Sequence, residues 1–443
     1  MPKLLQIGLG LIFVFALSRC QYTRYLEEDE ALLWEQEIEL SSQKTPKYGA
    51  ASILKQQPNQ SWLGWRPSLM LYNWGDGTDT SLFGKMGNPP VLFDPVKGQQ
   101  GIQQLENFYF NRGFFQVHGT EKVKRRKNKA RVTYQLELGP RYRVDTVEYR
   151  LDSGHMRGLT RYFLADRKVR KGDFYNSSLL DKERDRLKEI FRNHGYFSFA
   201  SSYISYQADT VSPEEKHRVR LILNVAPRTE RREDTVVQLP HQRSKIRSIN
   251  IQPDFSYQRS SQVRDTLNFR DYKIVYDTLR YKPGYLTEAI HFKPGDYYSQ
   301  EVVQETYGHL ASYNGFSITE INFNADTLDS TETELQAQIK LSPRDKYTFT
   351  ANAEATNLSN NLGINGSVGI INRNLFNAGE ALRLDLSSGL EYQPTLGNQA
   401  NLSRTFEVGA ELSLDFPRFL LPINTVGLLP KRMLPRSSLS IFN

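Results

Sequence analysis

The chain has 443 residues, with 57 Lys or Arg against 49 Asp or Glu and a formal net charge of +8. A hydrophobic content of 39% and an aromatic content of 12% are enough to bury several cores, which excludes a fully disordered chain. After residue 20 no stretch offers the roughly 18 apolar residues of a spanning helix, which excludes a polytopic helical membrane protein but not one built from strands.

The first twenty residues have the pattern of an export signal. Lys3 precedes an apolar run from Leu4 to Leu17, which is too short for a membrane span but typical of a secretory signal. We therefore predict that residues 1–19 form a signal peptide. The only cysteine, Cys20, closely follows this run and has no second cysteine with which to form a disulfide.

The residues Leu17-Ser18-Arg19-Cys20 resemble the lipobox of bacterial lipoproteins. The resemblance implies that Cys20 is lipidated and becomes the N-terminus of the mature protein. Arg19 departs from the lipobox, which has a small residue at this position, and the alternative is an ordinary signal peptide followed by an unmodified cysteine. One acyl chain holds a protein only marginally, so stable attachment needs a second membrane element.

Three segments share one pattern, a helix followed by a break of the form polar-x-Gly-aromatic and then by two strands. The breaks contain Gly113, Gly195 and Gly315. In each break the glycine suits a left-handed helix C-cap, and the aromatic side chain can fold back on a core. Each break therefore predicts the end of a helix that has one face to bury.

Similar phrases precede the second and third helices. Gly-Asp-Phe-Tyr at residues 172–175 and Gly-Asp-Tyr-Tyr at residues 295–298 are followed by Asn176 and Ser299, which suit helix N-caps. The sequence therefore predicts three α+β modules in tandem, at residues 20–141, 142–228 and 241–343.

Two of these modules carry insertions. Residues 43–93 interrupt the first module, and all four tryptophans of the chain fall between Trp34 and Trp74. They could pack in an enlarged core or form a patch that faces a partner. The third module carries an insertion from Asp254 to Thr287, rich in Arg, Asp and Tyr, which we expect to form a long loop or an extra helix.

From Lys346 the sequence alternates strictly between apolar and polar residues. The apolar face of the first such strand consists of Tyr347, Phe349, Ala351, Ala353 and Ala355. Three more runs follow, and residues 437–443 read as the start of a fifth strand. Strands of this length with one polar face are typical of a membrane barrel, although a soluble sheet packed on a second sheet would alternate in the same way. We predict that residues 345–443 are the N-terminal part of an antiparallel transmembrane β-barrel.

A run of cations from Lys122 to Arg131 is the densest charge cluster and falls at a predicted hairpin. Lipid headgroups or an acidic partner could engage it, or it could be a solvated hairpin that resists aggregation. The seven histidines are scattered, and the sequence holds no metal, nucleotide or hydrolase motif. We expect no enzymatic activity, no cofactor and no metal, and the export signal disfavours nucleic acid as a partner.

The Gly-Asp-x-Tyr phrases, the glycine breaks and the alternating tail together resemble the BamA/TamA (Omp85) family of outer-membrane assembly factors. The phrase Asn-Arg-Asn-Leu-Phe-Asn-Ala-Gly-Glu at residues 372–380 is similar to a strand connection in that family's barrels. The lipobox and the enlarged first module resemble its lipidated TamA-like branch. The resemblance implies POTRA-like modules in tandem, followed by the first strands of a barrel that would continue beyond Asn443.

The same resemblance implies a function at the bacterial outer membrane. POTRA-like modules in the periplasm would receive unfolded β-barrel clients at exposed sheet edges, and the barrel would assist their insertion. The first barrel strand, about Tyr347 to Thr356, would lie at a seam that opens toward the client. The implied partners are unfolded outer-membrane protein clients, outer-membrane lipid, and either an inner-membrane-anchored protein that spans the periplasm or accessory lipoproteins.

Two other functions fit the same pattern. A two-partner secretion pore shares the modules and the barrel, although three modules and a lipid anchor weigh against it. A periplasmic scaffold, whose last strands form a soluble sandwich, would wash off membranes without detergent.

Overall fold

A computed structural model of the chain describes residues 22–42, 45–62, 64–75, 77–78, 80–151, 154–210, 217–232, 235–257, 265–326, 333–358, 361–394, 402–418 and 436–443. The predicted signal peptide and Cys20 lie outside the described residues. The chain divides into two compact units, one of Met1–Leu151, Leu164–Asp185 and Ile204–Val225, the other of Asp152–Phe163, Arg186–Tyr203 and Ala226–Asn443. Over the described ranges, none of the helices has the length and apolar character of a transmembrane helix.

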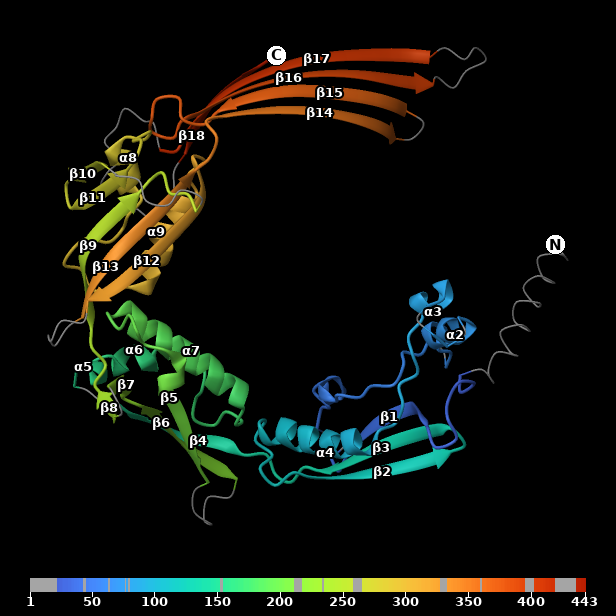
Figure 1. The fold of residues 1–443 in the computed structure, drawn as a ribbon. Helices are drawn as coiled ribbons and strands as arrows, with labels where there is room; N and C mark the ends of the chain where they lie inside the picture. Colours follow the sequence, from blue (N-terminus) through green and yellow to red (C-terminus); the bar gives the residue numbers. More distant parts are fainter. Residues whose placement is uncertain are drawn as a thin grey trace. The chain divides into compact units, whose positions relative to one another are not determined.

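The first module is a three-stranded sheet with one long helix beside it (Figure 1). Its elements are β1 (Leu32–Leu40), η2 (Ala50–Ile53), α2 (Pro67–Trp74), α3 (Leu82–Met86), α4 (Pro95–Phe110), β2 (His118–Arg126) and β3 (Lys129–Glu137). The strand order is β1-β3-β2, with β1 parallel and β2 antiparallel to β3. Leu105 and Tyr109 of α4 pack with Val132 and Leu136 of β3 to form the core.

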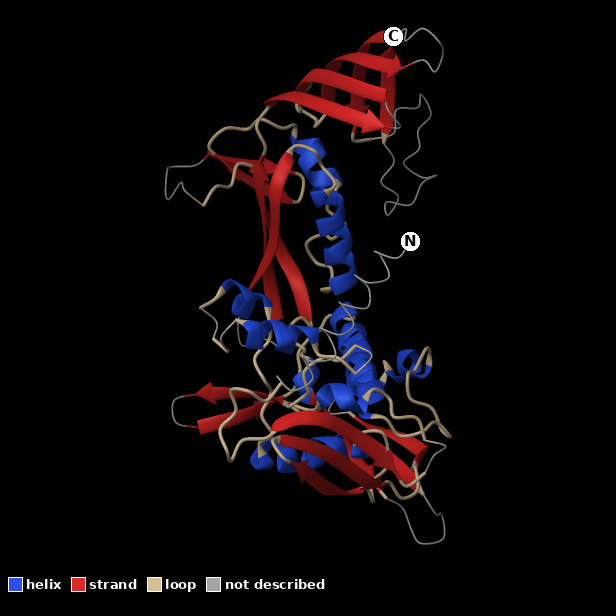
Figure 2. Cartoon of the chain, turned by 90° about the vertical axis from the view of Figure 1, so that its right-hand side faces the viewer, coloured by secondary structure: helices blue, strands red, loops and turns tan. Residues whose placement is uncertain are grey.

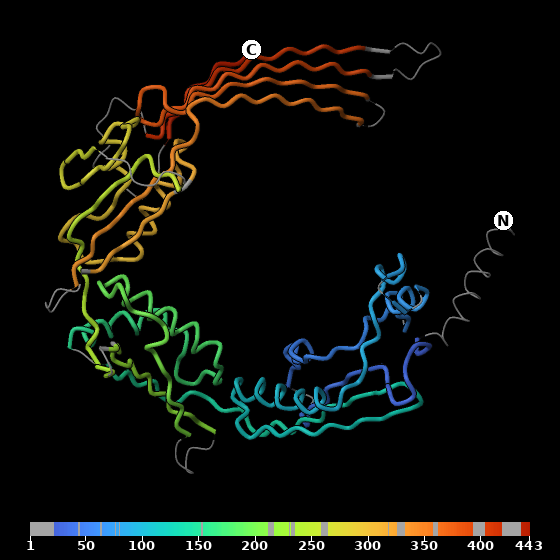
Figure 3. The backbone as a smooth tube through the Cα atoms, in the orientation of Figure 1, coloured from blue at the N-terminus to red at the C-terminus, as the bar shows by residue number. Residues whose placement is uncertain are grey.

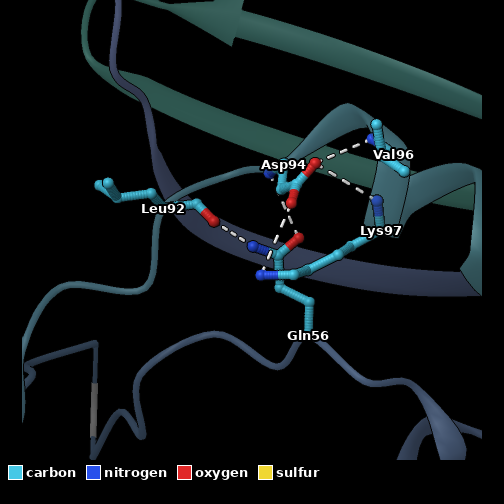
Figure 4. A network of polar contacts seen from close by, with 5 residues as sticks. All are labelled: Gln56, Leu92, Asp94, Val96 and Lys97. Carbon is cyan, nitrogen blue, oxygen red and sulfur yellow. Dashed lines mark hydrogen bonds and ion pairs between the residues drawn. The ribbon is translucent and has the colours of Figure 1, made fainter.

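A polar network fixes the start of α4 (Figure 4). The Asp94 carboxylate accepts hydrogen bonds from the N–H groups of Val96 and Lys97, at 2.9 and 3.4 Å, and so caps the helix. Gln56 donates to the Leu92 carbonyl, and its own side-chain oxygen accepts from the Asp94 N–H at 3.4 Å. The insertion is thereby tied to the helix start, where a cap of this kind contributes about 1 kcal/mol.

The second module repeats this sheet topology. Its elements are β4 (Arg143–Arg150), α5 (Gly154–Arg157), α6 (Thr160–Leu164), α7 (Ser177–Asn193), η3 (Ser201–Tyr203), β5 (Ile204–Asp209) and β6 (Arg218–Val225). The order is β4-β6-β5, with β4 parallel and β5 antiparallel to β6. In the first unit, Leu180 of α7 packs with Leu221 of β6. In the second unit, the Phe191 ring at the end of α7 lies 5.4 Å from the Phe163 ring and 4.4 Å from the Phe199 ring.

The third module has the same central pairing and a wider sheet. A short hairpin of β7 (Arg228–Arg232) and β8 (Thr235–Leu239) precedes it, and its elements are β9 (Ser244–Gln252), β10 (Asp265–Phe269), β11 (Tyr272–Tyr276), α8 (Pro283–Glu288), α9 (Gln300–Ala311), β12 (Phe316–Asp326) and β13 (Thr333–Pro343). The order is β10-β11-β9-β13-β12, with β9 parallel to β13. Figure 2 shows α9 running alongside these strands, where Leu310 joins a core with Ile249 and Ile339.

Part of the insertion in the third module differs from expectation. Residues 265–276 form the hairpin β10–β11 rather than a loop or a helix, and Tyr272 of β11 lies in parallel register with Ile249 of β9. Among the described residues of the insertion, the extra helix of the prediction is α8, six residues long. The hairpin extends the sheet because Tyr272 and Ile274 bury their side chains in its core.

The last strands form a single antiparallel sheet, which the backbone trace in Figure 3 shows as strands running side by side. They are β14 (Tyr347–Leu358), β15 (Asn361–Asn372), β16 (Ala381–Pro394), β17 (Leu402–Phe416) and β18 (Ser437–Phe442), in the order β14-β15-β16-β17-β18. The predicted fifth strand is confirmed, because β18 pairs with β17. The fold is therefore a set of α+β modules followed by an antiparallel sheet, as the sequence predicts.

Two of the three glycine breaks have the predicted backbone. Gly113 and Gly195 have φ angles of 90° and 105°, in the left-handed region that ends a helix. Gly315 does not, so the prediction of a left-handed cap is wrong there. A Cβ atom at Gly315 would lie 2.8 Å from the Tyr281 hydroxyl, which donates to the Gly315 carbonyl at 3.0 Å. At this break glycine is required by a close contact instead of by the backbone angle.

Candidate functional site

The sheet β14–β18 separates apolar from polar side chains across all five strands. Phe349 lies opposite Ile370, which lies opposite Leu384, and the row continues through Leu412 to Ile441. Side chains directly opposite each other share a face of a sheet, so this row runs from edge to edge. We call the apolar face the set Tyr347, Phe349, Ala351, Ala353, Ala355, Leu362, Ile364, Val368, Ile370, Leu382, Leu384, Leu386, Leu390, Phe406, Val408, Ala410, Leu412, Leu414, Leu439 and Ile441.

Much of the apolar face is open. Phe349 is 76% exposed, and Phe406 and Ile441 are each 67% exposed. Removing an apolar side chain of this size from water stabilises a protein by about 1.5–3 kcal/mol, so a soluble fold would bury such a row. A contiguous exposed apolar surface marks a contact with lipid or with another protein.

The apolar face has the height of a bilayer core. Tyr347 stands at one end, and the register places Tyr392 at the other, in the row of Asn357, ten positions along β14. At about 3.3 Å per residue and a strand tilt of about 40°, this distance is about 25 Å along the membrane normal. The Arg404 guanidinium lies 5.6 Å from the Tyr392 ring. Tyrosines at both borders are typical of the aromatic girdles of membrane strands.

The opposite face of the same sheet is polar and carries acids that form no ion pair with another described residue. Asp385 lies directly opposite Glu411, and Glu407 lies on the same face of β17. Like charges placed opposite each other destabilise a sheet unless water screens them. A hollow of about 420 Å³, lined among others by Asn352 and Glu354, lies against this face. One face is therefore suited to hydrocarbon and the other to water.

Each module covers the outer edge of its first strand. In the second module, Val144 of β4 donates to the Asp173 carbonyl at 2.8 Å and accepts from the Gly172 N–H at 2.7 Å. In the third, Ile246 of β9 forms the same pair of bonds with Asp296 and Gly295, at 2.9 and 2.7 Å. The Gly-Asp-aromatic-Tyr phrases thus act as an edge cover, a role that the sequence did not indicate.

The first module achieves the same result with a different segment. The Leu33 N–H donates to the Val91 carbonyl at 2.8 Å, and the Phe93 N–H donates to the Ala31 carbonyl at 2.7 Å. In all three modules the first strand is therefore covered over part of its length. The strands β2, β5 and β12 lie at the opposite edge of their sheets. Among the described residues, each of them pairs with one strand only, so its outer side is open.

The free edge of β5 presents identifiable donors. The Ala226 N–H donates to the Tyr203 carbonyl at 2.8 Å, so these two residues form a hydrogen-bonded pair in the register that β5 and β6 continue. Bonded and non-bonded pairs alternate along an antiparallel ladder. The N–H groups of Ile204, Tyr206 and Ala208 therefore point away from β6, toward the open edge.

The same reasoning applies to β14, the predicted seam strand and an edge of its sheet. The Arg373 N–H donates to the Lys346 carbonyl at 2.9 Å, which makes the even-numbered residues of β14 the bonded ones. The backbone N–H groups of the predicted set then point to the open edge, while its side chains lie on the apolar face. That set is Tyr347, Phe349, Ala351, Ala353 and Ala355.

The connection between β15 and β16 is anchored on the third module. The Asn374 side chain donates to the Arg280 carbonyl at 2.8 Å, and the Lys282 N–H donates to the Asn377 carbonyl at 2.7 Å. The Glu380 carboxylate, only 2% exposed, accepts from the Ala378 N–H at 3.0 Å and holds the turn in shape. The phrase that resembled a strand connection is therefore also a docking turn.

Buried aromatic and imidazole groups lie behind this turn. The Tyr285 and Tyr313 rings stack at 4.2 Å, and burial raises the pKa of both phenols. The Nδ1 atom of His309, on α9, lies 3.2 Å from the Nε2 atom of His291. Burial lowers the pKa of His309 to about 4, and the neighbouring His291 and Arg436 act in the same direction. Across the described ranges, no three or more His, Cys, Asp or Glu side chains gather as metal ligands would.

Comparisons with solved structures return distant similarities. The chain aligns with BamA POTRA3–5 of Haemophilus influenzae at 12% identity and a TM-score of 0.35, over 71% of this chain and 99% of that one. It aligns with BamA of Haemophilus ducreyi lacking POTRA domains 1–3 at 13% identity and a TM-score of 0.32, over 62% of this chain and 48% of that one. The chain aligns with POTRA1–3 of the periplasmic domain of Omp85 from Anabaena at 14% identity and a TM-score of 0.23, over 72% of this chain and 98% of that one.

A family match is confined to the second module. None of the curated proteins matches the chain. Residues 156–228 match the family described as "POTRA: Surface antigen variable number repeat". This range covers α7, β5 and β6. It therefore includes the free edge of β5 described above. The second module is therefore similar to a POTRA repeat.

Proposed function

We propose that this protein assists the assembly and insertion of β-barrel proteins at the bacterial outer membrane, with its modules in the periplasm. The observation that carries the proposal is the exposed apolar face of β14–β18, which is about as tall as a bilayer core and backed by a polar face. This sheet would be the first part of a membrane barrel. The POTRA-like second module supports the same assignment.

The modules would bind clients through their backbones. An unfolded barrel protein offers extended segments, and such a segment can add to the open edge of β2, β5 or β12 by main-chain hydrogen bonds that do not depend on its sequence. In the first and second modules the covered first strand would direct clients to the other edge of the sheet, whereas in the third module β10 is a second edge strand beside β12. No covalent step, cofactor or metal is needed for this activity.

The strand β14 would repeat the same chemistry in the membrane. Its outward N–H groups and carbonyls would pair with the first strand of a client, while outer-membrane lipid covers the apolar face. Lipidation of Cys20, as in the TamA-like branch, would add a second attachment. An inner-membrane-anchored protein that spans the periplasm, or accessory lipoproteins, would be further partners of the modules.

Depletion of the protein in its own cell tests this function. We expect the folded, heat-modifiable forms of specific outer-membrane proteins to decrease, because their insertion would lose its catalyst. Loss of one secreted protein with every outer-membrane protein unchanged would instead identify a secretion pore. Release of the chain from membranes by salt, without detergent, would identify a periplasmic scaffold.

A single substitution tests the edge mechanism. Ala208→Pro removes a donor that points to the open edge of β5 and leaves the bonds to β6 in place. We expect reduced crosslinking of a photoreactive group in β5 to an unfolded client and reduced client insertion, with unchanged thermal stability. Ala208→Thr is the matched control, because it keeps the N–H group. Equal crosslinking by both variants would argue against pairing at this edge.

A further inference from the structure

The insertion in the first module exposes several large apolar side chains. Leu82 is 72% exposed, Trp62 67% and Met86 64%, and Phe83 and Trp74 are about half exposed at 50% and 49%. Isolated exposed residues of this kind are common, but these five are concentrated on α2, α3 and the segment before α2, and the two helices contact each other. We call these five residues the apolar patch.

The patch lies at the end of the sheet that also holds the basic hairpin turn. The Leu32 N–H donates to the Asn128 carbonyl in that turn at 2.9 Å, and Leu32 packs with Leu69 of α2. The Trp34 ring connects the hairpin with the insertion. The Lys129 ammonium, at the start of β3, lies 3.7 Å from its centroid, and the Arg66 guanidinium, just before α2, lies 4.5 Å from it. Figure 1 shows α2 and α3 at this end of β1.

Three cations of the hairpin form no ion pair with another described residue. Lys122, Lys124 and Arg126 of β2 project on one face, and Lys124 lies directly opposite Arg131 of β3. Arg131 is paired with Glu35 at 2.6 Å, whereas none of the three β2 cations forms an ion pair with a described residue. Such a row of like charges is unfavourable unless an anionic surface meets it.

Acidic residues at the same end do not cancel this charge. The turn before β1 carries four acids, at residues 27–30, and no described ion pair joins them to the hairpin. The cations from Lys122 to Lys129, together with Lys85 of α3, outnumber these acids. The end of the module is therefore positively charged and apolar at once.

We infer that this end of the first module docks on an anionic lipid bilayer. Trp, Phe, Leu and Met side chains of the apolar patch would enter the boundary between headgroups and acyl chains, and the hairpin cations would meet lipid phosphates. An acidic peptide added to β2 would satisfy the cations but leave the apolar patch in water. Tyr22, the first described residue, belongs to the same end of the module, since its ring centroid lies 5.9 Å from that of Trp34.

Tryptophan fluorescence tests this inference in the full chain, because all four tryptophans lie in the first module and the sheet β14–β18 has none. The chain would carry Cys20→Ser, so that no acyl chain can hold the module at the membrane. It would be reconstituted in vesicles of phosphatidylcholine and phosphatidylglycerol in equal parts, with brominated acyl chains as quenchers. We expect blue-shifted, quenched emission in these vesicles, and neither effect in phosphatidylcholine alone or in about 1 M salt, where charge attraction is screened within about 3 Å.

Matched variants separate charge from apolar contact. Lys124→Glu with Arg126→Glu should weaken binding of the module to these vesicles by about 30-fold or more, since each cation near an anionic surface contributes about fivefold. The control is Arg157→Glu with Lys168→Glu, which removes two exposed cations of the second module.

The apolar contribution has its own pair of variants. Leu82→Asp with Phe83→Asp should abolish the quenching, whereas Val236→Asp, at a residue 68% exposed in the β7–β8 hairpin, should not. Unquenched wild-type emission in the anionic vesicles would overturn the inference. So would equal quenching in neutral vesicles, or an emission change that requires an acidic peptide instead of lipid.

Discussion

The substitution Val408→Arg distinguishes a lipid-facing sheet from a water-facing one. Val408 is 68% exposed and lies opposite Ser388, in the row that reaches Ala353 of β14 near the middle of the apolar face. In water an arginine at so open a position changes the free energy of unfolding by less than about 0.5 kcal/mol. At the midplane of a bilayer the same change costs about 2–4 kcal/mol, or about 30- to 900-fold in the folding equilibrium.

The assay is urea unfolding of the full chain in phosphatidylcholine vesicles, followed by heat-modifiable gel mobility. We expect the Val408→Arg midpoint to fall by the amount that corresponds to this cost. Glu407→Arg is the control. Glu407 precedes Val408 on the same strand, and its side chain lies on the polar face. A Val408→Arg variant that unfolds at the wild-type urea concentration would show that the apolar face meets water, and the membrane assignment would be wrong.

Three further substitutions test the third module and its docking turn. Glu380→Ala should cost about 1–3 kcal/mol by thermal denaturation, since it leaves the buried N–H of Ala378 without an acceptor, while Glu380→Gln keeps an acceptor and should cost less. The pKa of His309 is lower in the folded state than the ordinary 6.5, so the unfolded state binds the proton first and stability should fall by about 2 kcal/mol as pH drops from about 6.5 to about 4. His309→Gln should flatten that pH dependence in urea titrations. Gly315→Ala should cost about 1–3 kcal/mol through its clash with the Tyr281 hydroxyl, and Tyr281→Phe should recover part of this loss; full additivity would refute the contact.

Local sequence patterns were sufficient to predict an element when one of its faces is apolar and the other is polar. The two-residue alternation from Tyr347 predicted β14, and the same signal predicted β16 and β17, because every second side chain along a strand lies on the same face. Helix ends were also predictable. Ser299 caps α9 by accepting from the Val302 N–H, and Gly113 and Gly195 end their helices in the left-handed conformation.

Features that depend on distant pairing could not be predicted in this way. The hairpin β10–β11 has only five residues per strand, and it is held by the pairing of Tyr272 with Ile249. The phrase at residues 172–175 gave a correct helix start, yet its bonds to Val144 are made across the module. Likewise nothing near Gly315 indicates the approach of Tyr281.

The parallel pairing of first and last strands sets the order in which each module can form. In the first module Leu32 of β1 lies in register with Lys129 of β3, so β1 lacks its neighbouring strand in the sheet until the chain has been made almost to residue 140. At about 5–20 residues per second, a ribosome needs roughly 5–20 s to supply that partner. A nascent module of this topology therefore stays open for seconds, and pairing across so long a separation is slow to nucleate even afterwards. Chaperones that hold unfolded chains have their opportunity in this interval.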